Sequence, residues 1–370
     1  MNRLVLIGNG FDLAHGLKTS YKDFISWYWK ERIIKLNKET TNVSEDTLCR
    51  LAILQGYAWS IFVHQNINFL TNTEGKDIYQ YLKKHPEEFE IKSSEFLYNI
   101  CVSIETKKWV DVENEYYELL KKYALKDKDD TKVKELNEQL GFLQEKLIEY
   151  LRTIGTNRVI KDLHNAITDF FDPADFSTEG KKMALENLGL ENTNLEEIQY
   201  NFEEQKKLIP ERIMLLSFNY TATAKMYGNF NIVFNYIHGE LEHPENIIFG
   251  YGDELDKDFQ GILDRNDNEM LMNVKSIKYV ETGHYHKMLE FLMSAPFQVL
   301  IMGHSCGNSD RTLLNRVFEH ENCVSIKPFY HKWPDGSDNY LELVQNISRN
   351  FTNMQLYRDR VVYKERCKTI

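Results

Sequence analysis

Four short stretches of this 370-residue chain place glycine, hydroxyl, amide or imidazole groups directly after an apolar run. Glycine lets a backbone approach an anion closely, and an amide or imidazole can orient or deprotonate a water molecule. In α/β proteins such groups gather beyond the carboxyl ends of strands, where ligands bind. The four stretches are GNGFD at residues 8–12, SFNYT at 217–221, IHG at 237–239 and GHSCGNSD at 303–310.

The first stretch is typical of a glycine turn between a strand and a helix. The apolar run RLVLI at residues 3–7 precedes it, and the amides of a helix start would attract a phosphate. The dinucleotide motif GxGxxG needs a third glycine where this chain has leucine, so the match is incomplete. The alternative is a plain tight turn that leaves a strand. We predict nucleotide contacts from Gly8, Asn9, Gly10, Phe11 and Asp12.

The second and third stretches supply the two residues that we predict to be catalytic. Asn219 follows the run IMLLSF and offers both a donor and acceptors to a ribose hydroxyl or a water molecule. His238 ends another short run, beside a glycine, and could take a proton near neutral pH. For Asn219 the alternative is a helix cap shared with Thr221, and for His238 it is a structural role.

The fourth stretch follows the run QVLIM and leads into a predicted helix that Ser309 would cap. We predict that Gly303, Ser305, Ser309 and Asp310 complete the nucleotide site. The same letters also read GxSxG, the nucleophile elbow of hydrolases. That alternative would need an acid and a histidine downstream, for which the candidates are Asp310, Asp335, His320 and His331.

A fifth stretch, WVDVE at residues 109–113, brings two carboxylates close together. In an extended segment Asp111 and Glu113 would share a face and could hold a metal ion. The favoured interpretation is a helix start with acidic residues near its N-terminus. No HExxH, DxDxDG or paired Cys/His set is present, so the sequence demands no metal.

The elements that must position these groups are short apolar strands alternating with helices. Helices are predicted over residues 310–320 and 341–351, the latter introduced by Ser337 and Asp338. Such alternation predicts an α/β fold, a Rossmann-like parallel sheet. We expect residues 1–30 and 211–370 to form it, and 31–210 to be a large helical insertion, or cap. The predicted strands are residues 3–7, 213–218, 234–237, 247–249, 298–302 and 324–329.

The predicted insertion has an almost entirely helical pattern. A helix start of the capping-box kind stands at Thr19, Ser20 and Asp23. Apolar residues spaced by three and four over residues 133–154 predict a long helix that packs on another helix, in the cap or between protomers. The charge-dense stretch before it, residues 122–134, is predicted to be an exposed turn or loop.

Composition narrows the class of protein. Lys and Arg number 45 against 56 Asp and Glu, and the net charge of −11 disfavours a broad grip on nucleic acid. Five scattered cysteines favour reduced thiols over a disulfide framework or a zinc site. Neither a signal peptide nor a run of about 18 apolar residues is seen, which predicts a cytoplasmic protein without a membrane partner.

The motifs taken in order resemble the AbiH family of bacterial phage abortive-infection proteins. The resemblance lies in LVLIGNGFDLAHGLKTSYKDF, WVDVE, LSFNYT, IHG and GHSCGNSD. That family is more distantly similar to the sirtuin-like NAD-binding domains of bacterial defence. There a GAG-type loop, a T-x-N-Y-D segment, an H-G dipeptide and a G-x-S-x-x-D segment surround NAD.

What the resemblance implies is an NAD pocket in which Asn219 and His238 hold the nicotinamide ribose and activate water. Two departures stand out: Thr221 replaces the aspartate of the second segment, and four residues rather than two separate Ser305 from Asp310. The zinc-binding cysteines of deacetylating sirtuins are absent, which argues against peptide deacetylation.

The leading hypothesis is therefore a phage-defence effector that binds NAD or a related nucleotide and hydrolyses its N-glycosidic bond. No cofactor is required, because the nucleotide is substrate or ligand. The alternatives are a non-catalytic nucleotide sensor that signals to a partner, and a metal-dependent nuclease that uses Asp111 and Glu113. Expected partners are the nucleotide, a phage-derived trigger and a further copy of the chain; neither nucleic acid nor a membrane is expected.

Overall fold

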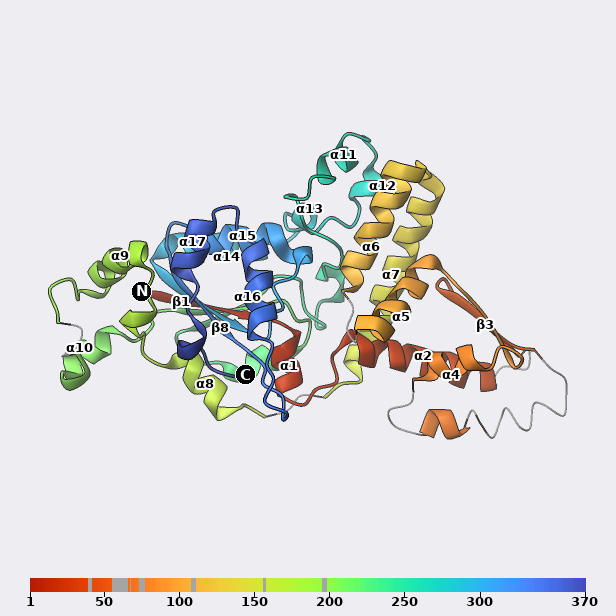
Figure 1. The fold of residues 1–370 in the computed structure, drawn as a ribbon, viewed down its shortest axis with the longest axis horizontal. Coiled ribbons are helices and arrows are strands. Elements are labelled where there is room, and N and C mark those ends of the chain that lie inside the picture. The colour runs from red at the N-terminus through yellow and green to blue at the C-terminus, as the bar shows by residue number, and fades with distance from the viewer. Residues whose placement is uncertain are drawn as a thin grey trace. The chain divides into compact units, whose positions relative to one another are not determined.

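The computed structural model describes residues 1–38, 42–54, 66, 68–72, 77–107, 111–155, 158–194 and 198–370. The chain divides into two compact units, shown by ribbon in Figure 1. The sheet unit comprises residues 1–18, 155–260 and 274–370. The helical unit comprises residues 19–154 and 261–273. The chain therefore leaves the sheet unit twice, and each unit is described separately below.

A five-stranded parallel sheet forms the centre of the sheet unit. Its order β6-β5-β1-β7-β8 corresponds to the order 3-2-1-4-5 of doubly wound dinucleotide-binding folds. β1 is the central strand, paired with β5 on one side and β7 on the other. The predicted α/β Rossmann-like class is thus confirmed. The strands are β1 (Asn2–Ile7), β5 (Ile213–Ser217), β6 (Ile232–Tyr236), β7 (Phe297–Met302) and β8 (Cys323–Phe329).

Helices cover both faces of the sheet because successive side chains of a strand point to opposite sides. Leu4 and Leu6 of β1 belong to a core with α14 (His284–Ser294), α15 (Arg311–Phe318) and α16 (Tyr340–Arg349). The alternate residues Val5 and Ile7 belong to a second core with α1 (Asn9–Ala14) and α8 (Lys161–Thr168). In Figure 1, α15 and α16 lie on one side of the sheet and α8 on the other.

Several shorter helices are also present in the described part of the chain. No helix that the structure describes has both the length and the apolar character needed to cross a bilayer. The shorter helices of the sheet unit are α9 (Thr178–Leu188), α10 (Phe202–Lys207), α13 (Lys275–Lys278) and α17 (Met354–Arg360). A further short helix, α11 (Phe259–Leu263), lies where the chain passes into the helical unit.

Four predicted strands after residue 210 correspond to β5 to β8, but the prediction of a strand over residues 247–249 is wrong. That segment makes one backbone bond to the end of β6, from Ile248 N to His238 O at 2.9 Å, and continues no ladder. The predicted helix over 341–351 is α16. The helix predicted from Asp310 is α15, but Ser309 lies in a preceding 3-10 turn (Asn308–Asp310), and Asp310 stands at the N-cap position.

The helical unit is built on α2 (Tyr21–Lys38) and α7 (Asp130–Arg152), together with α4 (Ile78–Lys84), α5 (Glu95–Lys107), α6 (Val112–Lys121) and α12 (Asn268–Leu271). The predicted capping box is present at α2: the Asp23 amide donates to Ser20 Oγ at 3.1 Å. The long helix predicted over 133–154 is α7, and its apolar stripe is buried. The loop predicted at 122–134 is instead mostly helical, with a π-helix (Lys122–Asp127) before α7.

The helical unit also contains a small antiparallel sheet that the helical pattern did not reveal. Its strands are β2 (Val43–Glu45), β3 (Cys49–Ile53) and β4 (Phe89–Ser93), in that order. The pairs Glu45–Arg50 and Arg50–Lys92 set polar residues opposite one another on one face. Their strands are therefore not the continuous apolar runs by which the parallel strands could be found.

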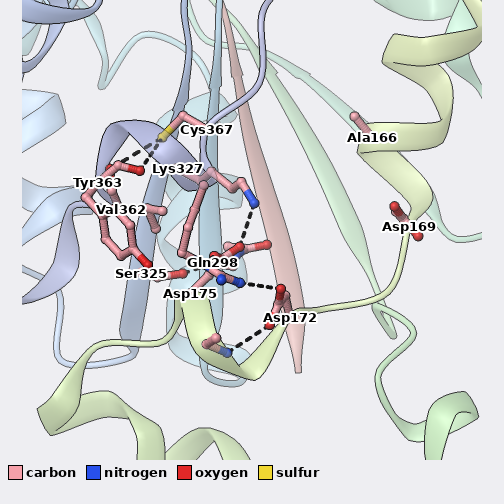
Figure 2. Close-up of polar contacts among 12 residues, drawn as sticks. Ala166, Asp169, Asp172, Asp175, Gln298, Ser325, Lys327, Val362, Tyr363 and Cys367 are labelled. Carbon is pink, nitrogen blue, oxygen red and sulfur yellow. Dashed lines mark hydrogen bonds and ion pairs between the residues drawn. The ribbon is translucent and has the colours of Figure 1, made fainter. Parts of the chain in front are cut away.

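The insertion differs in extent from the predicted 31–210, because residues 158–194 and 198–210 pack with the sheet unit. The buried Arg3 guanidinium on β1 donates to the carbonyls of Ile167 at 2.9 Å and Asp169 at 2.7 Å. Figure 2 shows Lys327 reaching from β8 to Asp175, with Nζ 2.7 Å from Oδ2. Arg366 Nε donates to the other oxygen of Asp175 at 2.6 Å. Buried hydrogen bonds and partly buried ion pairs thus fix this segment to the sheet.

Candidate functional site

The glycines of the first and fourth motifs lie against one another, at the carboxyl ends of β1 and β7. Gly10 N donates to Gly303 O at 2.8 Å. A Cβ added to Gly8 would come within 2.5 Å of His304 Cα, and one on Gly10 within 2.8 Å of Gly303 Cα. Gly303 has a φ of +74°, and a Cβ there would lie 2.0 Å from Phe11 N. The contact between two backbone turns is sufficient to require glycine at these three positions.

The backbone amides in this turn are also engaged by the protein. Gly8 N donates to Met302 O at 3.2 Å, and Phe11 N donates to Gly8 O at 2.9 Å. The Phe11 ring is fully buried and packs on His15 and Tyr227, with ring centroids 4.7 and 5.2 Å apart. Asn9 is exposed. Of this motif, Asp12 is therefore the residue whose side chain has chemistry to offer beside the sheet edge.

Asp12 is buried beside the end of β5. Its Oδ2 accepts from Thr221 Oγ1 at 2.6 Å, and its buried Oδ1 has no hydrogen-bond partner among the described residues. Burial raises the pKa of Asp12, and hydrogen bonds from Thr221, Thr223 and Asn219 oppose the rise. The hydroxyl of Thr221 thus holds the Asp12 carboxylate beside the end of β5.

Asn219 joins the ends of β5 and β1. Its side-chain Nδ2 donates to Gly8 O at 3.0 Å, and its backbone amide donates to Ser217 Oγ at 3.2 Å. These bonds orient the carboxamide at the carboxyl edge of the sheet, where the side chain is partly exposed. Its Oδ1 is an acceptor that a ligand hydroxyl or a water molecule could use.

His238, at the end of β6, belongs to a buried charged cluster centred on Asp310. Oδ1 of Asp310 accepts from Lys275 Nζ at 2.8 Å and lies 3.2 Å from His238 Nε2. His304 Nε2 lies 3.5 Å from the other carboxylate oxygen. The Tyr279 hydroxyl is 3.2 Å from His238 Nε2. We call these five residues the Asp310 cluster.

The hydrogen bonds of the cluster define how its groups are protonated. Burial would raise the pKa of Asp310, but the Lys275 ammonium and the two imidazoles hold it well below its usual range. Burial and the nearby Lys275 charge lower the pKa of His238 to about 4, against the effect of Asp310. Near neutral pH His238 is therefore an uncharged imidazole. Because a carboxylate only accepts, Nε2 carries the proton and Nδ1 is the basic nitrogen.

Aromatic rings separate and cover the two imidazoles. The Phe218 ring lies 5.2 Å from His238, edge to face, and 4.1 Å from His304. His304 Nδ1 accepts from Cys306 N at 3.0 Å, so its Nε2 carries the proton that points towards Asp310. Cys306 itself has a positive φ of 54°. The turn after β7 thus serves to aim His304 inward.

The structure brings Asn219, Asp12, His238 and Asp310 to one edge of the sheet, and leaves two other predicted contacts less directly placed. Ser305 is exposed, and its carbonyl accepts from Asn346 Nδ2 at 3.0 Å. Ser309 is buried, and its carbonyl accepts from Gly252 N at 3.1 Å. Their nucleotide contacts stay predictions.

The nucleophile-elbow alternative finds no support in the turn after β7. The left-handed residues of that turn are Gly303 and Cys306, whereas the elbow needs its strain at the serine. No described histidine bonds to Ser305 Oγ, and His320 Nδ1 instead accepts from Asn322 N at 3.1 Å.

The two carboxylates of the fifth motif lie in the helical unit. Asp111 caps α6 by accepting from Asn114 N at 3.0 Å, and Glu113 follows in the first turn. Trp109 and Val110 lie outside the described residues. Within the described ranges, no group of three or more His, Cys, Asp or Glu is disposed to hold a metal ion. This geometry fits the favoured interpretation, an acidic helix start.

Sequence reasoning missed three members of the Asp310 cluster. His304 could have been found, because it stands beside Gly303 in a motif already singled out. Lys275 and Tyr279 lie in a segment without a recognisable motif. The sequence alone does not distinguish the fully buried Lys275 from an exposed lysine. Only the fold, which carries this segment to Asp310, reveals them.

The fold and its buried polar centre define a doubly wound α/β protein of the kind whose ligands bind at the carboxyl edge of the sheet. Residues 4–331 match the family model of bacteriophage abortive infection AbiH. The chain belongs to this AbiH family, which supports a role in abortive infection by phage. No curated protein and no solved structure matches the chain. The likeness to sirtuin-like domains stays a prediction.

Proposed function

We propose that this AbiH protein binds NAD or a related dinucleotide at the carboxyl edge of its sheet and hydrolyses the bond between nicotinamide and ribose. The observation that carries the proposal is the buried Asp310–His238 pair, 3.2 Å apart, at the end of a strand next to the one that ends in Asn219. Loss of cellular NAD would account for an abortive outcome of infection. The strand order supports a dinucleotide, because such folds bind one beyond the carboxyl ends of β1 and its neighbours.

The chemistry would proceed through a positively charged, oxocarbenium-like sugar. The bond between C1′ and the nicotinamide nitrogen breaks, and its electron pair leaves with the nicotinamide. Water adds to C1′, and one of its protons passes to Nδ1 of His238. The products are nicotinamide, ADP-ribose and a proton.

Asp310 compensates for the low basicity of a buried imidazole. A group with a pKa of about 4 is a weak base at pH 7, but the Asp310 carboxylate stabilises the imidazolium as it forms. Asn219 Oδ1 would orient the water or a ribose hydroxyl. Asp12, whose Oδ1 has no hydrogen-bond partner in the described part of the chain, would accept from a second ribose hydroxyl or stabilise the positive sugar.

A second candidate is a nucleotide sensor that binds without cleaving. The observation that favours it is the burial of the proposed base: His238 is only 4% exposed. Cleavage then requires a rearrangement that admits water and substrate to Nδ1, whereas sensing requires only that the ligand engage Asn219 and its surroundings. Variants separate the two functions, since a sensor keeps its protective effect without His238 chemistry.

The test is to incubate the purified protein with NAD and follow nicotinamide and ADP-ribose by chromatography, with and without lysate of phage-infected cells. We expect release that falls at least about a hundredfold in Asn219→Ala and His238→Ala. The matched controls are the exposed Asn229→Ala and His243→Ala, which should cleave as the parent does. Each variant is first shown to be folded by circular dichroism and its melting temperature.

Three other outcomes would change the proposal. Binding of NAD without release, with phage protection kept in both site variants, would replace the enzyme by the sensor. Neither binding nor release under any condition would overturn both. DNA or RNA cleavage that stops with EDTA would instead support the metal-dependent nuclease.

A further inference from the structure

The second excursion of the chain into the helical unit ends directly at the Asp310 cluster. Residues 261–273 belong to the helical unit, and the chain rejoins the sheet unit at Val274. Val274 forms a bridge with Tyr251, and Lys275 N donates to Tyr251 O at 2.8 Å. The next side chain along is Lys275 itself, fully buried, with Nζ 2.8 Å from Asp310 Oδ1.

The excursion is fastened to the helical unit by a buried polar centre on α7. Asn137 Nδ2 donates to Glu269 O at 2.8 Å, and Asn273 Nδ2 donates to Asn137 Oδ1 at 3.1 Å. Tyr116 OH on α6 donates to the same Oδ1 at 2.7 Å. Buried side-chain networks of this kind hold one arrangement firmly, because any broken bond leaves a group unsatisfied. We therefore expect Asn273 to move together with α6 and α7.

Two successive backbone steps separate this anchor from the charged cluster. Asn273 is held by Asn137, and Lys275 is held by Asp310. Two residues of extended chain span at most about 7 Å, so there is little slack between the two anchors. A displacement of the loop within the helical unit must either be absorbed by Val274 or move Lys275.

We propose that Lys275 is a positioning residue for His238, and that residues 261–273 are a tether through which the helical unit controls it. This inference rests on the proposed function for its biological meaning. While Lys275 neutralises Asp310, His238 stays an uncharged base. When the tether withdraws the ammonium, the buried carboxylate is left with the imidazoles as its partners, and His238 takes up a proton. A protonated His238 cannot accept a proton from water, so the reaction stops.

Among the described residues, the charged and titratable groups beside His238 act on it in opposite directions. Asp310 from the start of α15 favours the protonated imidazole, while Lys275 from α13 disfavours it. His304 after β7 also disfavours it, and the Tyr279 hydroxyl contributes a hydrogen bond. Lys275 and Tyr279 both belong to the segment that follows the tether, and Lys275 is the one that carries a charge. Its withdrawal thus changes the balance at His238 without disturbing the strand ends.

The first experiment follows the protonation of His238 by NMR in ¹⁵N-histidine-labelled, ligand-free protein, with His238→Gln assigning its signal. In Lys275→Met we expect its titration midpoint to rise by at least about one pH unit. Lys275→Arg, which retains the charge, should stay close to the parent. An unchanged midpoint in folded Lys275→Met would overturn the positioning role.

The second experiment tests the tether with a substitution in the helical unit. It remains informative about the tether even if Lys275→Met does not fold. Asn137→Ala should raise the His238 midpoint in the same direction, although the change lies on α7. The matched control is Ser103→Ala on α5, which also removes a buried hydrogen bond, to Glu115 Oε1 at 2.6 Å, but none to the tether. A parent-like midpoint in folded Asn137→Ala, or an equal rise in Ser103→Ala, would overturn the tether.

These measurements separate failure of the switch from failure of the proposed function. The titrations use no nucleotide, so they give the same answer whether or not NAD is cleaved. Where cleavage is found, Asn137→Ala should lower kcat at least about fivefold and leave KM within about twofold. A fall in binding alone would point to a structural role for Asn137 instead.

Discussion

Two places at the same sheet edge use opposite kinds of contact. At the ends of β1 and β7, Gly8 and Gly10 pack closely against the backbone of Gly303 and His304. At the end of β6, side chains make the structure: His238, Lys275 and Asp310 form a buried charged cluster. The first place is a steric junction and the second an electrostatic one, although their motifs look alike as sequence.

A glycine-rich turn after a strand can require its glycines for backbone packing rather than for binding a phosphate. Here the amide of Gly10 and the space above it are taken up by Gly303. The groups with spare chemical capacity are instead Asp12, Asn219 and His238. Variants that change only the available space, or only the charge, can test this distinction between the steric junction and the charged cluster.

The largest effect is expected at the steric junction. Gly303→Ala places a Cβ 2.0 Å from Phe11 N and keeps a φ of +74°, so the two turns must separate. We expect the free energy of unfolding to fall by at least about 5 kcal/mol, or no folded protein. Denaturant unfolding of Gly141→Ala is the control: nothing lies near that helical glycine, and we expect a gain of about 0.5–1 kcal/mol. Equal behaviour of both variants would contradict the junction.

Asp310→Asn tests the electrostatic place with little change of shape. It leaves the Lys275 ammonium buried without its carboxylate, and we expect a loss of about 4 kcal/mol in unfolding free energy. The double variant Lys275→Met/Asp310→Asn should recover part of that loss, because no unpaired charge remains. The exposed Asp335→Asn serves as control. Equal losses in the single and double variants would mean that charge pairing is not the cause.

The pH dependence of stability should carry the signature of His238. Its folded pKa of about 4 lies below the unfolded value of 6.5, so between these values the unfolded state binds more protons. Stability is therefore lost as the pH falls from 6.5 to 4, by up to about 3 kcal/mol from this group. Urea titrations over this range should show a steeper fall for the parent than for His238→Gln. Parallel curves would be inconsistent with a buried neutral imidazole.

The smallest effect is expected after β5, the strand that lies between β1 and β6 in the sheet. Thr221→Val removes the hydroxyl that donates to Asp12 Oδ2 at 2.6 Å and keeps the shape of the side chain. We expect a loss of about 1–2 kcal/mol, because a buried acceptor then lacks its donor. Because that donor opposes the effect of burial, its loss should also raise the pKa of Asp12 further. Thermal unfolding against Thr106→Val, on the exposed face of α5, measures the difference.

The parallel sheet could be predicted because its strands are buried on both faces and read as apolar runs, as in RLVLI and QVLIM. β2, β3 and β4 could not, because residues such as Arg50 and Lys92 interrupt any run. The apolar run over residues 247–249 gave a wrong strand prediction, because three apolar residues can be buried without joining a β-ladder. Asn219, His238 and Asp310 were found from their strand-end motifs, and their use by a nucleotide stays a prediction.

The rest of the site depends on contacts between residues that are distant in sequence. The buried charge of Lys275 is compensated by Asp310, 35 positions later. Glycine is needed at position 8 only because the turn after β7 occupies the adjoining space. Neither fact has a local signature, since each depends on how the strands are ordered.

The central place of β1 has a consequence for biosynthesis. Residues 2–7 pair with residues 213–217 and 297–302, which a ribosome makes far later. At about 5–20 residues per second, roughly 15 to 60 seconds pass before both neighbours exist. During that interval RLVLI lacks at least one of its two partner strands, while the contiguous residues 19–154 already contain most of the helical unit. During synthesis most of the helical unit can therefore assemble before the carboxyl edge of the sheet, which needs strands made later.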